Sequence, residues 1–190
     1  MRLLKLLLIL FAFAAGPVVA GPLEDGDAAY GKGDYATALR LLQPFADKGN
    51  ASAQNNLGLM YDFGRGVTQD YAAAVSWYRK AADQGDADAQ YNLGGMYDND
   101  QGVPQDYAAA ASWYRKAADQ DHAFAQNKLG VLYYTGHGVP KDYVQAHMWL
   151  NLAAAKGDAD AIKNRDIVTA KMTPAQISEA QKLARGWKPK

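Results

Sequence analysis

The stretch AQNNLGLMY at residues 53–61 recurs 36 residues later as AQYNLGGMY (89–97) and again as AQNKLGVLY (125–133). A second segment keeps the same spacing: GVTQDY at 66–71, GVPQDY at 102–107 and GVPKDY at 138–143. A period of this length, with helical patterning inside it, predicts stacked supersecondary units and not a globular domain around one closed core. The architecture is therefore expected to be an all-α repeat array.

One repeat, residues 86–121, shows two helical patterns separated by loop residues. Asp86 and Asp106 precede the two patterns, and aspartate at such positions accepts hydrogen bonds from the free backbone N–H groups of the first turn. Gly94 lies inside the first pattern, where glycine lowers helix stability. We therefore expect that close approach of the partner helix requires this glycine.

The repeats divide the chain into four parts. We expect a signal peptide at 1–20, an abbreviated first repeat at 21–52, three 36-residue repeats at 53–160 and capping helices at 161–190. Thr173 begins the last helix as its cap, with proline at the first helical position and Gln176 at the third. A polar terminal helix pair covers the last face of a repeat array, which keeps such arrays soluble.

The first 20 residues have the composition of a secretory signal peptide. Arg2 and Lys5 precede an apolar run, and small residues up to Ala20 predict cleavage after that residue. As a helix the run is about 20 Å long, shorter than the roughly 30 Å hydrocarbon core of a bilayer. No later segment is long and apolar enough to span. We expect a periplasmic or secreted protein without stable membrane insertion after cleavage.

Charge and cysteine content narrow the classes of partner. The chain has 20 basic and 20 acidic residues and no cysteine, so no disulfide can form. Removal of residues 1–20, which hold two basic residues and no acidic one, leaves a formal net charge of −2. No basic face or arm is present, so we expect no nucleic-acid partner.

The repeated unit A-x-x-x-L-G-x-x-Y…G-V…D-Y-x-x-A…W-[YL]-x-x-A-A…G resembles the Sel1-like repeat, a longer relative of the tetratricopeptide repeat. The resemblance covers roughly residues 27–161. It implies a right-handed α-solenoid of antiparallel helix pairs, and a scaffold or adaptor whose concave groove, lined mainly by the first helix of each pair, binds a protein or peptide. Some exported relatives are cysteine-rich and β-lactamase-like. This chain lacks those cysteines, so that activity does not carry over.

The groove positions of the related tetratricopeptide repeat, counted from each Leu-Gly pair, give a set of candidate binding residues. They differ between repeats while the packing residues do not, and their Asn, Asp, Tyr and Phe side chains suit a peptide backbone and aromatic anchors. The competing interpretation is ordinary solvated helix surface. The candidates are Asn55, Leu59, Asp62 and Phe63 in the second repeat, Tyr91, Gly95, Asp98 and Asn99 in the third, and Asn127, Val131, Tyr134 and Thr135 in the fourth.

No catalytic constellation is evident in the sequence. There is no cysteine nucleophile and no pair of histidines at metal-binding spacing, so we expect no catalytic residue, metal or cofactor. His122 stands where other repeats carry aspartate at a helix start, and we expect a solvated turn residue. His137 lies in a loop, and His147 replaces Val75 and Ala111 on the second helix of its repeat.

Two other function classes stay open beside the scaffold. The first is a cell-wall enzyme such as a hydrolase, suggested only by the cysteine-rich relatives. The second is a peptidoglycan or glycan-binding module, which needs exposed aromatic platforms such as Tyr91 and Tyr134. Trp77, Trp113 and Trp149 resemble a carbohydrate-stacking series, but they stay in register with alanine pairs. We therefore expect these three indoles to be buried packing residues.

Overall fold

The computed structural model describes residues 21–190, which form ten helices joined by loops. The first helices of the pairs, called A helices here, are α1 Pro22–Gly31, α3 Ala51–Phe63, α5 Ala87–Asp98, α7 Ala123–Thr135 and α9 Ala159–Thr169. Their partners, the B helices, are α2 Tyr35–Asp47, α4 Tyr71–Ala82, α6 Tyr107–Asp119 and α8 Tyr143–Ala155, and α10 Pro174–Gly186 follows. The signal-peptide prediction concerns 1–20 and lies outside the described residues.

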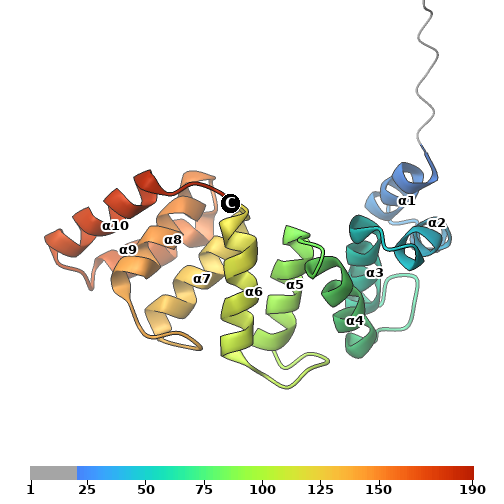
Figure 1. The fold of residues 1–190 in the computed structure, drawn as a ribbon, viewed down its shortest axis with the longest axis horizontal. Coiled ribbons are helices and arrows are strands. Elements are labelled where there is room, and N and C mark those ends of the chain that lie inside the picture. Colours follow the sequence, from blue (N-terminus) through green and yellow to red (C-terminus); the bar gives the residue numbers. More distant parts are fainter. Residues whose placement is uncertain (1–20) are drawn as a thin grey trace, which may run out of the picture.

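The helices follow one another along the long axis of the molecule, from α1 at one end to α9 and α10 at the other (Figure 1). Each helix from α1 to α8 packs against the next one in sequence, and the A helices also touch at α1–α3, α3–α5 and α7–α9. This arrangement confirms the predicted all-α solenoid of paired helices. No helix within residues 21–190 is both long and apolar enough to cross a membrane.

Local sequence accounts for the helix starts. The aspartates at the starts of six helices are N-caps whose carboxylates accept backbone N–H bonds from the first turn, as predicted for Asp86 and Asp106. Thr173 and Gln176 form a capping box at the start of α10, which confirms the predicted start of this helix. Gly85 has a φ of 96° in the turn before α5, a conformation that favours glycine.

The glycine of each Leu-Gly pair brings the A helix close to a large side chain of its B partner. A Cβ atom added at Gly58, Gly94 or Gly130 would lie 2.4, 2.7 or 2.6 Å from Tyr78, Tyr114 or Leu150, respectively. These distances are shorter than any carbon–carbon contact can be. The expectation that close approach requires Gly94 is confirmed.

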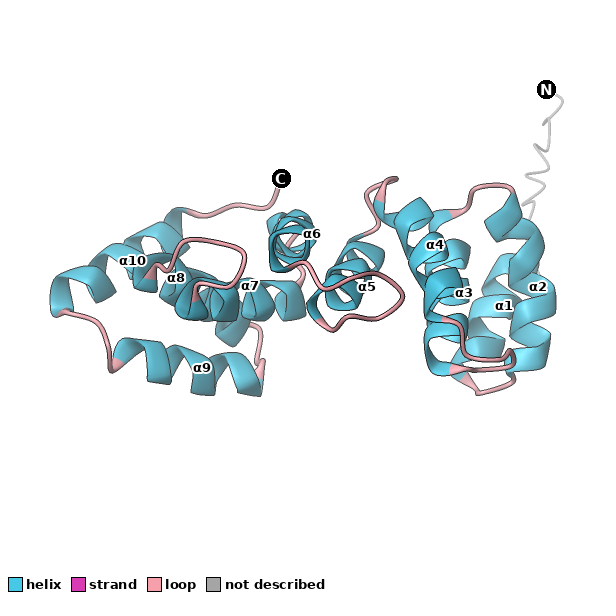
Figure 2. Cartoon of the chain, turned by 90° about the horizontal axis from the view of Figure 1, so that it is seen from below, coloured by secondary structure: helices cyan, strands magenta, loops and turns pink. Residues whose placement is uncertain are grey.

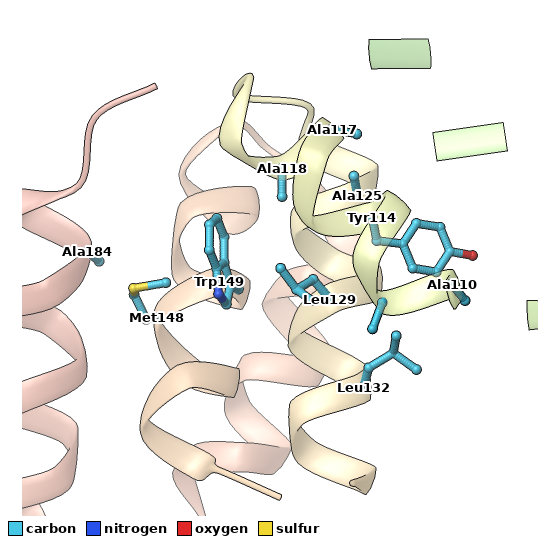
Figure 3. Packing of buried hydrophobic residues seen from close by; sticks show 11 residues of the cluster. Ala110, Tyr114, Ala117, Ala118, Ala125, Leu129, Leu132, Met148, Trp149 and Ala184 are labelled. Carbon is cyan, nitrogen blue, oxygen red and sulfur yellow. The ribbon is translucent and has the colours of Figure 1, made fainter. Parts of the chain in front are cut away.

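The tryptophan series is buried only in part. Trp149 is 2% exposed, and Figure 3 shows it beside Leu129 of α7. Trp77 and Trp113 are half-buried, and a lysine ammonium lies 3.8 Å from the centroid of each ring. Tyr78 and Tyr114 are fully buried instead. The packing prediction thus holds fully for Trp149 and partly for the other two.

Buried glutamines connect successive repeats. Gln54, Gln90 and Gln126 follow the first alanine of the repeated stretch, and each donates from its side-chain amide to a carbonyl at the end of the preceding B helix. The amide oxygens of Gln54 and Gln90 accept from Gln84 and Gln120 in the next turn, at 2.7 and 2.8 Å. Gln54 and Gln90 therefore satisfy their buried amides only when the preceding helix pair and the turn at the end of their own pair are both in place.

The C-terminal segment turns back along the repeats. Helix α10 packs against α8, and the Trp187 ring meets Trp149 edge-on with centroids 6.0 Å apart. At the end of the chain the Lys190 ammonium lies 2.9 Å from the Asp119 carboxylate of α6, and Figure 2 shows the C-terminus beside this helix. The fourth repeat is thus covered by its own C-terminal extension.

Candidate binding groove

The surface of helices α3, α5, α7 and α9 contains three hollows in sequence, and we call this surface the groove. The first, of about 240 Å³, lies over α5 and includes Phe63 of α3 and Lys128 of α7 in its lining. The second, of about 260 Å³, lies between α7 and α9, and the third, of about 170 Å³, is lined by Tyr134 and Ile167. Most of the candidate binding residues line these hollows or their immediate surroundings.

Asparagine pairs bridge the A helices at two of the three steps along the groove. The Asn92 amide donates to Asn55 Oδ1 at 3.0 Å between α3 and α5, and Asn164 donates to Asn127 Oδ1 at 3.0 Å between α7 and α9. Asn55 is only 8% exposed. Both candidates therefore hold neighbouring A helices together. Between α5 and α7 the corresponding residues are Tyr91 and Lys128, and no such bond is formed there.

Asp62 and Asp98, two further candidates, each accept a hydrogen bond from a B-helix tyrosine in the same repeat. Tyr78 donates to Asp62 at 3.1 Å and Tyr114 donates to Asp98 at 3.3 Å. Burial raises the pKa of the Asp62 carboxyl and, with the nearby carboxylate, raises the pKa of the Tyr78 hydroxyl. The Asp62 carboxylate is therefore partly desolvated, and each of the two aspartates keeps one oxygen on its tyrosine.

The fourth repeat replaces both members of this pair. Tyr134 stands in place of the aspartate and Leu150 in place of the tyrosine. Tyr134 is half-buried, with its ring centroid 5.9 Å from that of Tyr143, and it lines the third hollow together with Val131 and Thr135. Here the groove offers apolar and aromatic surface where the second and third repeats offer a carboxylate.

The remaining candidates differ in exposure. Phe63 is 57% exposed, and Leu59 packs against the apolar cluster that α4 and α5 form. Asn99 follows the end of α5, and its side chain donates to the Gly95 carbonyl at 2.9 Å. Among the candidates, Phe63 is thus a large apolar side chain that projects from the groove into solvent.

His122 is placed differently from the prediction. It is the N-cap of α7, as a helix-start position requires, but its side chain is only 14% exposed. Its Nδ1 accepts from the Ala125 N–H at 3.1 Å, its Nε2 lies 3.0 Å from Asp88, and its ring stacks on Tyr91 at 4.9 Å. Expecting a solvated residue was wrong, because Tyr91 of the preceding repeat covers the imidazole. Burial lowers the pKa of this histidine.

The sequence analysis missed several residues of the groove. Lys128 lines the first two hollows, and Asn92 and Asn164 complete the amide bridges. Lys128 and Asn92 occupy the same position of their repeats, next to the chosen candidates, and this difference in the sequence could have identified the position as variable. Within residues 21–190 no three His, Asp or Glu side chains gather so as to hold a metal ion. The groove offers aromatic, amide and isolated charged side chains, which suit binding.

The fold and the groove define an α-solenoid scaffold built from helix pairs. The family model described as Sel1 repeat matches four segments, residues 21–50, 51–86, 87–122 and 123–158. Because these matches span most of the sequence, the chain belongs to the Sel1 repeat family. Proteins built from such repeats commonly mediate protein interactions. A comparison with curated proteins found no match.

Solved structures with this fold include two of substantial sequence identity. One is a protective antigen of uropathogenic Escherichia coli strains, 36% identical with a TM-score of 0.77 over 86% of this chain and 38% of that one. Another is a Sel1 repeat protein from Oxalobacter formigenes, 39% identical with a TM-score of 0.72 over 76% of this chain and 60% of that one. The chain thus spans less than two thirds of either protein.

A more distant structure shares the fold alone. Helicobacter pylori cysteine-rich protein B is 24% identical, with a TM-score of 0.51 over 74% of this chain and 94% of that one.

Proposed function

We propose that this protein is an exported scaffold that works by binding: the groove of α3, α5, α7 and α9 holds an extended segment of a protein partner. The observation that carries the proposal is the row of three hollows along these helices. Their lining changes from repeat to repeat, while many of the residues that pack the helices together, such as Leu57, Leu93 and Leu129, stay the same. A surface that varies on a constant framework suits recognition of one particular sequence.

The size and chemistry of the groove favour a peptide segment over a large domain face. Its hollows hold individual side chains, and its amide groups suit the hydrogen-bonding groups of an extended backbone. The exposed Phe63 ring offers an aromatic anchor at one end of the row, and Tyr134 and Ile167 offer apolar surface at the other. Such buried aromatic contacts supply most of the affinity in many interfaces.

Export is the second part of the proposal and is supported by the sequence of residues 1–20, with their basic start, apolar run and small-residue end. Mass spectrometry of the protein purified from fractionated cells of its source tests this part. We expect a chain that begins at Gly21 in the periplasmic or extracellular fraction. A full-length chain in the cytoplasmic fraction would contradict it.

Capture from an envelope extract tests the binding part. The bait is residues 21–190, beside a groove variant in which Phe63, Asn99 and Lys128 are changed to alanine. These side chains are exposed, so their removal should leave the fold intact. A matched control changes Leu183, Gln181 and Lys182 of α10, which are also one apolar, one amide and one lysine side chain, all exposed.

The proposal requires a protein that the wild type and the α10 control retain and the groove variant loses. Equal retention by all three baits would place binding outside the groove. If none retains a protein, while soluble peptidoglycan fragments bind the wild type and not the groove variant, the alternative glycan-binding function gains support.

A further inference from the structure

Three departures from the repeat pattern meet at the hollow over α5. Tyr91 stands where the second and fourth repeats have Asn55 and Asn127, and Lys128 stands where other repeats have asparagine. Gly95 stands where the neighbouring repeats have Leu59 and Val131. All three residues line this hollow. The step of the groove that lacks an asparagine bridge is thus also the step that lacks a side chain at its floor.

Packing does not require Gly95. A Cβ atom at Gly95 would meet only the Tyr114 hydroxyl, at 3.8 Å, which is an ordinary contact. At the adjacent Gly94 the same atom would lie 2.7 Å from the Tyr114 ring. Glycine inside a helix lowers stability relative to alanine. Gly95 therefore weakens α5 without relieving a clash, and its structural effect is to leave open the space that a leucine or valine fills in the other repeats.

The walls of the hollow suit a positively charged side chain. Phe63, Tyr91 and Tyr114 contribute aromatic rings, and Asp62 contributes the one carboxylate among the lining residues. Aromatic faces attract cations, and a partly desolvated carboxylate gains from an incoming positive charge. The Phe63 ring already holds a guanidinium, since Arg65 lies 4.7 Å from its centroid and is tied by Nη1 to the Tyr30 hydroxyl.

The charge of the surrounding helices also favours a positively charged ligand. Helices α1, α3 and α5 contain no lysine or arginine, and the first basic residue on an A helix is Lys128 of α7. Their acidic residues are Glu24, Asp25, Asp27, Asp62, Asp88 and Asp98. Arg65, in the loop after α3, offsets one of these negative charges, and the remaining acidic residues attract a basic segment to the α3–α5 half of the groove. Lys128 disfavours a second cation at the α7 end.

We propose that the hollow over α5 is a subsite for a lysine or arginine side chain of the bound segment. This inference rests on the proposed function and names the chemistry of the partner at one position. The basic side chain enters beside Phe63 and Tyr91, and its charged end lies at the Asp62 side of the hollow. Gly95 provides the depth that the side chain needs.

A displayed library of random short peptides, selected on residues 21–190, tests the subsite. The selected peptides are synthesised with a fluorescent label, each beside a twin in which the basic residue is replaced by glutamine. Fluorescence anisotropy then gives Kd for the wild type, Gly95→Leu, Lys128→Gln and Ile167→Ser. Gly186→Ala is the matched glycine control, because a Cβ atom there meets nothing within 4 Å and the residue lies at the end of α10.

We expect the selected peptides to share a lysine or arginine. Glutamine in the peptide, or Gly95→Leu in the protein, should each weaken binding about tenfold or more, and the two losses should not add. Gly186→Ala should leave Kd unchanged, and Lys128→Gln, which removes a positive charge from the lining of the hollow, should lower it. Circular dichroism confirms that Gly95→Leu is folded, as the leucine at position 59 suggests.

Two results would overturn the subsite. If the selected peptides lack a common basic residue, or bind Gly95→Leu as tightly as wild type but lose affinity on Ile167→Ser, then the groove binds peptides by its α7–α9 half and the basic subsite is wrong. If the peptides bind every variant like wild type, or if the selection yields none, the groove proposal fails together with the subsite.

Discussion

The third and fourth repeats share a framework and differ in what fills the space between their helices. In the third repeat Tyr114 bonds to Asp98, Gly95 leaves a hollow, and Trp113 keeps one face toward Lys116. In the fourth, Leu150 and Tyr134 replace the bonded pair.

The fourth repeat also differs in the side chain at the Gly95 position and in the C-terminal segment that covers it. Val131 stands where the third repeat has Gly95, and Trp149 lies under Trp187. The comparison shows that residues in contact change together. It also shows that the segment packed against a repeat determines how deeply a given position of that repeat is buried.

The largest expected effect concerns the two tryptophans. Trp149→Ala should lower the free energy of unfolding by about 3–5 kcal/mol, as truncation of a buried aromatic does. Trp113→Ala should cost roughly half as much, because this indole is half-buried. Urea unfolding followed by circular dichroism compares the two variants. Equal losses would mean that the C-terminal cover over Trp149 contributes nothing.

Adjacent glycines in α5 should respond in opposite directions. Gly94→Ala forces a methyl group against Tyr114 and should destabilise the protein by about 1–3 kcal/mol. Gly95→Ala meets no close neighbour and should stabilise it by about 0.5–1 kcal/mol. Thermal unfolding of the two single variants measures the difference. A loss of stability in Gly95→Ala would assign this glycine to packing and remove the basis for the proposed subsite.

The carboxylate–tyrosine pair can be exchanged for the pair of the fourth repeat. Tyr114→Leu alone should cost stability, since it removes ring volume and the hydroxyl bonded to Asp98, whose hydrogen bond is worth about 1 kcal/mol. Adding Asp98→Tyr should recover part of the loss. A double-mutant cycle from chemical unfolding gives the coupling between the positions. Additive effects would show that the two replacements in the fourth repeat are unrelated.

The smallest effect distinguishes the cap of α7 from that of α3. Because burial lowers the pKa of His122, its contribution to stability is present above its ordinary value of 6.5 and is lost as pH falls below it. His122→Asn introduces the cap residue that Asn50 provides for α3, and should flatten the fall in stability between about pH 7.5 and about pH 5.5.

Unfolding midpoints across this pH range test the prediction. His147, whose pKa is also lowered by burial, is present in both proteins, so the difference between them reports His122. An unchanged pH profile in His122→Asn would mean that its protonation is not linked to folding.

Features that act within one repeat were predictable from the sequence. The helix caps and the Leu-Gly close approach depend on residues a few positions apart or on one helix pair, and each is visible in a single 36-residue unit. The candidate groove positions came from the resemblance to the tetratricopeptide repeat. The structure places most of them along the row of hollows, and their role in binding stays a prediction.

Features that join repeats were not predictable in the same way. Asn55 meets Asn92, and Tyr91 covers His122, across 37 and 31 positions of sequence, respectively. A single helical pattern shows which side of a helix is apolar, but it does not show which polar residue of the next repeat lies opposite. For this reason Asn55 was chosen as a free binding residue although it is bonded and buried, and His122 was expected in solvent.

Because of the buried glutamines, the chain can gain or lose whole repeats more easily than a few residues. Gln90 has one partner in the preceding helix pair and one in the turn of its own, so a deletion of a few residues between these points leaves a buried amide without a bond. We therefore expect changes in length in the loop inside a repeat, which is shorter in the first repeat, or by whole repeats. An added copy of residues 87–122 would lengthen the groove by one step and keep every amide paired. The structure can therefore be lengthened by whole 36-residue repeats without leaving a buried glutamine unpaired.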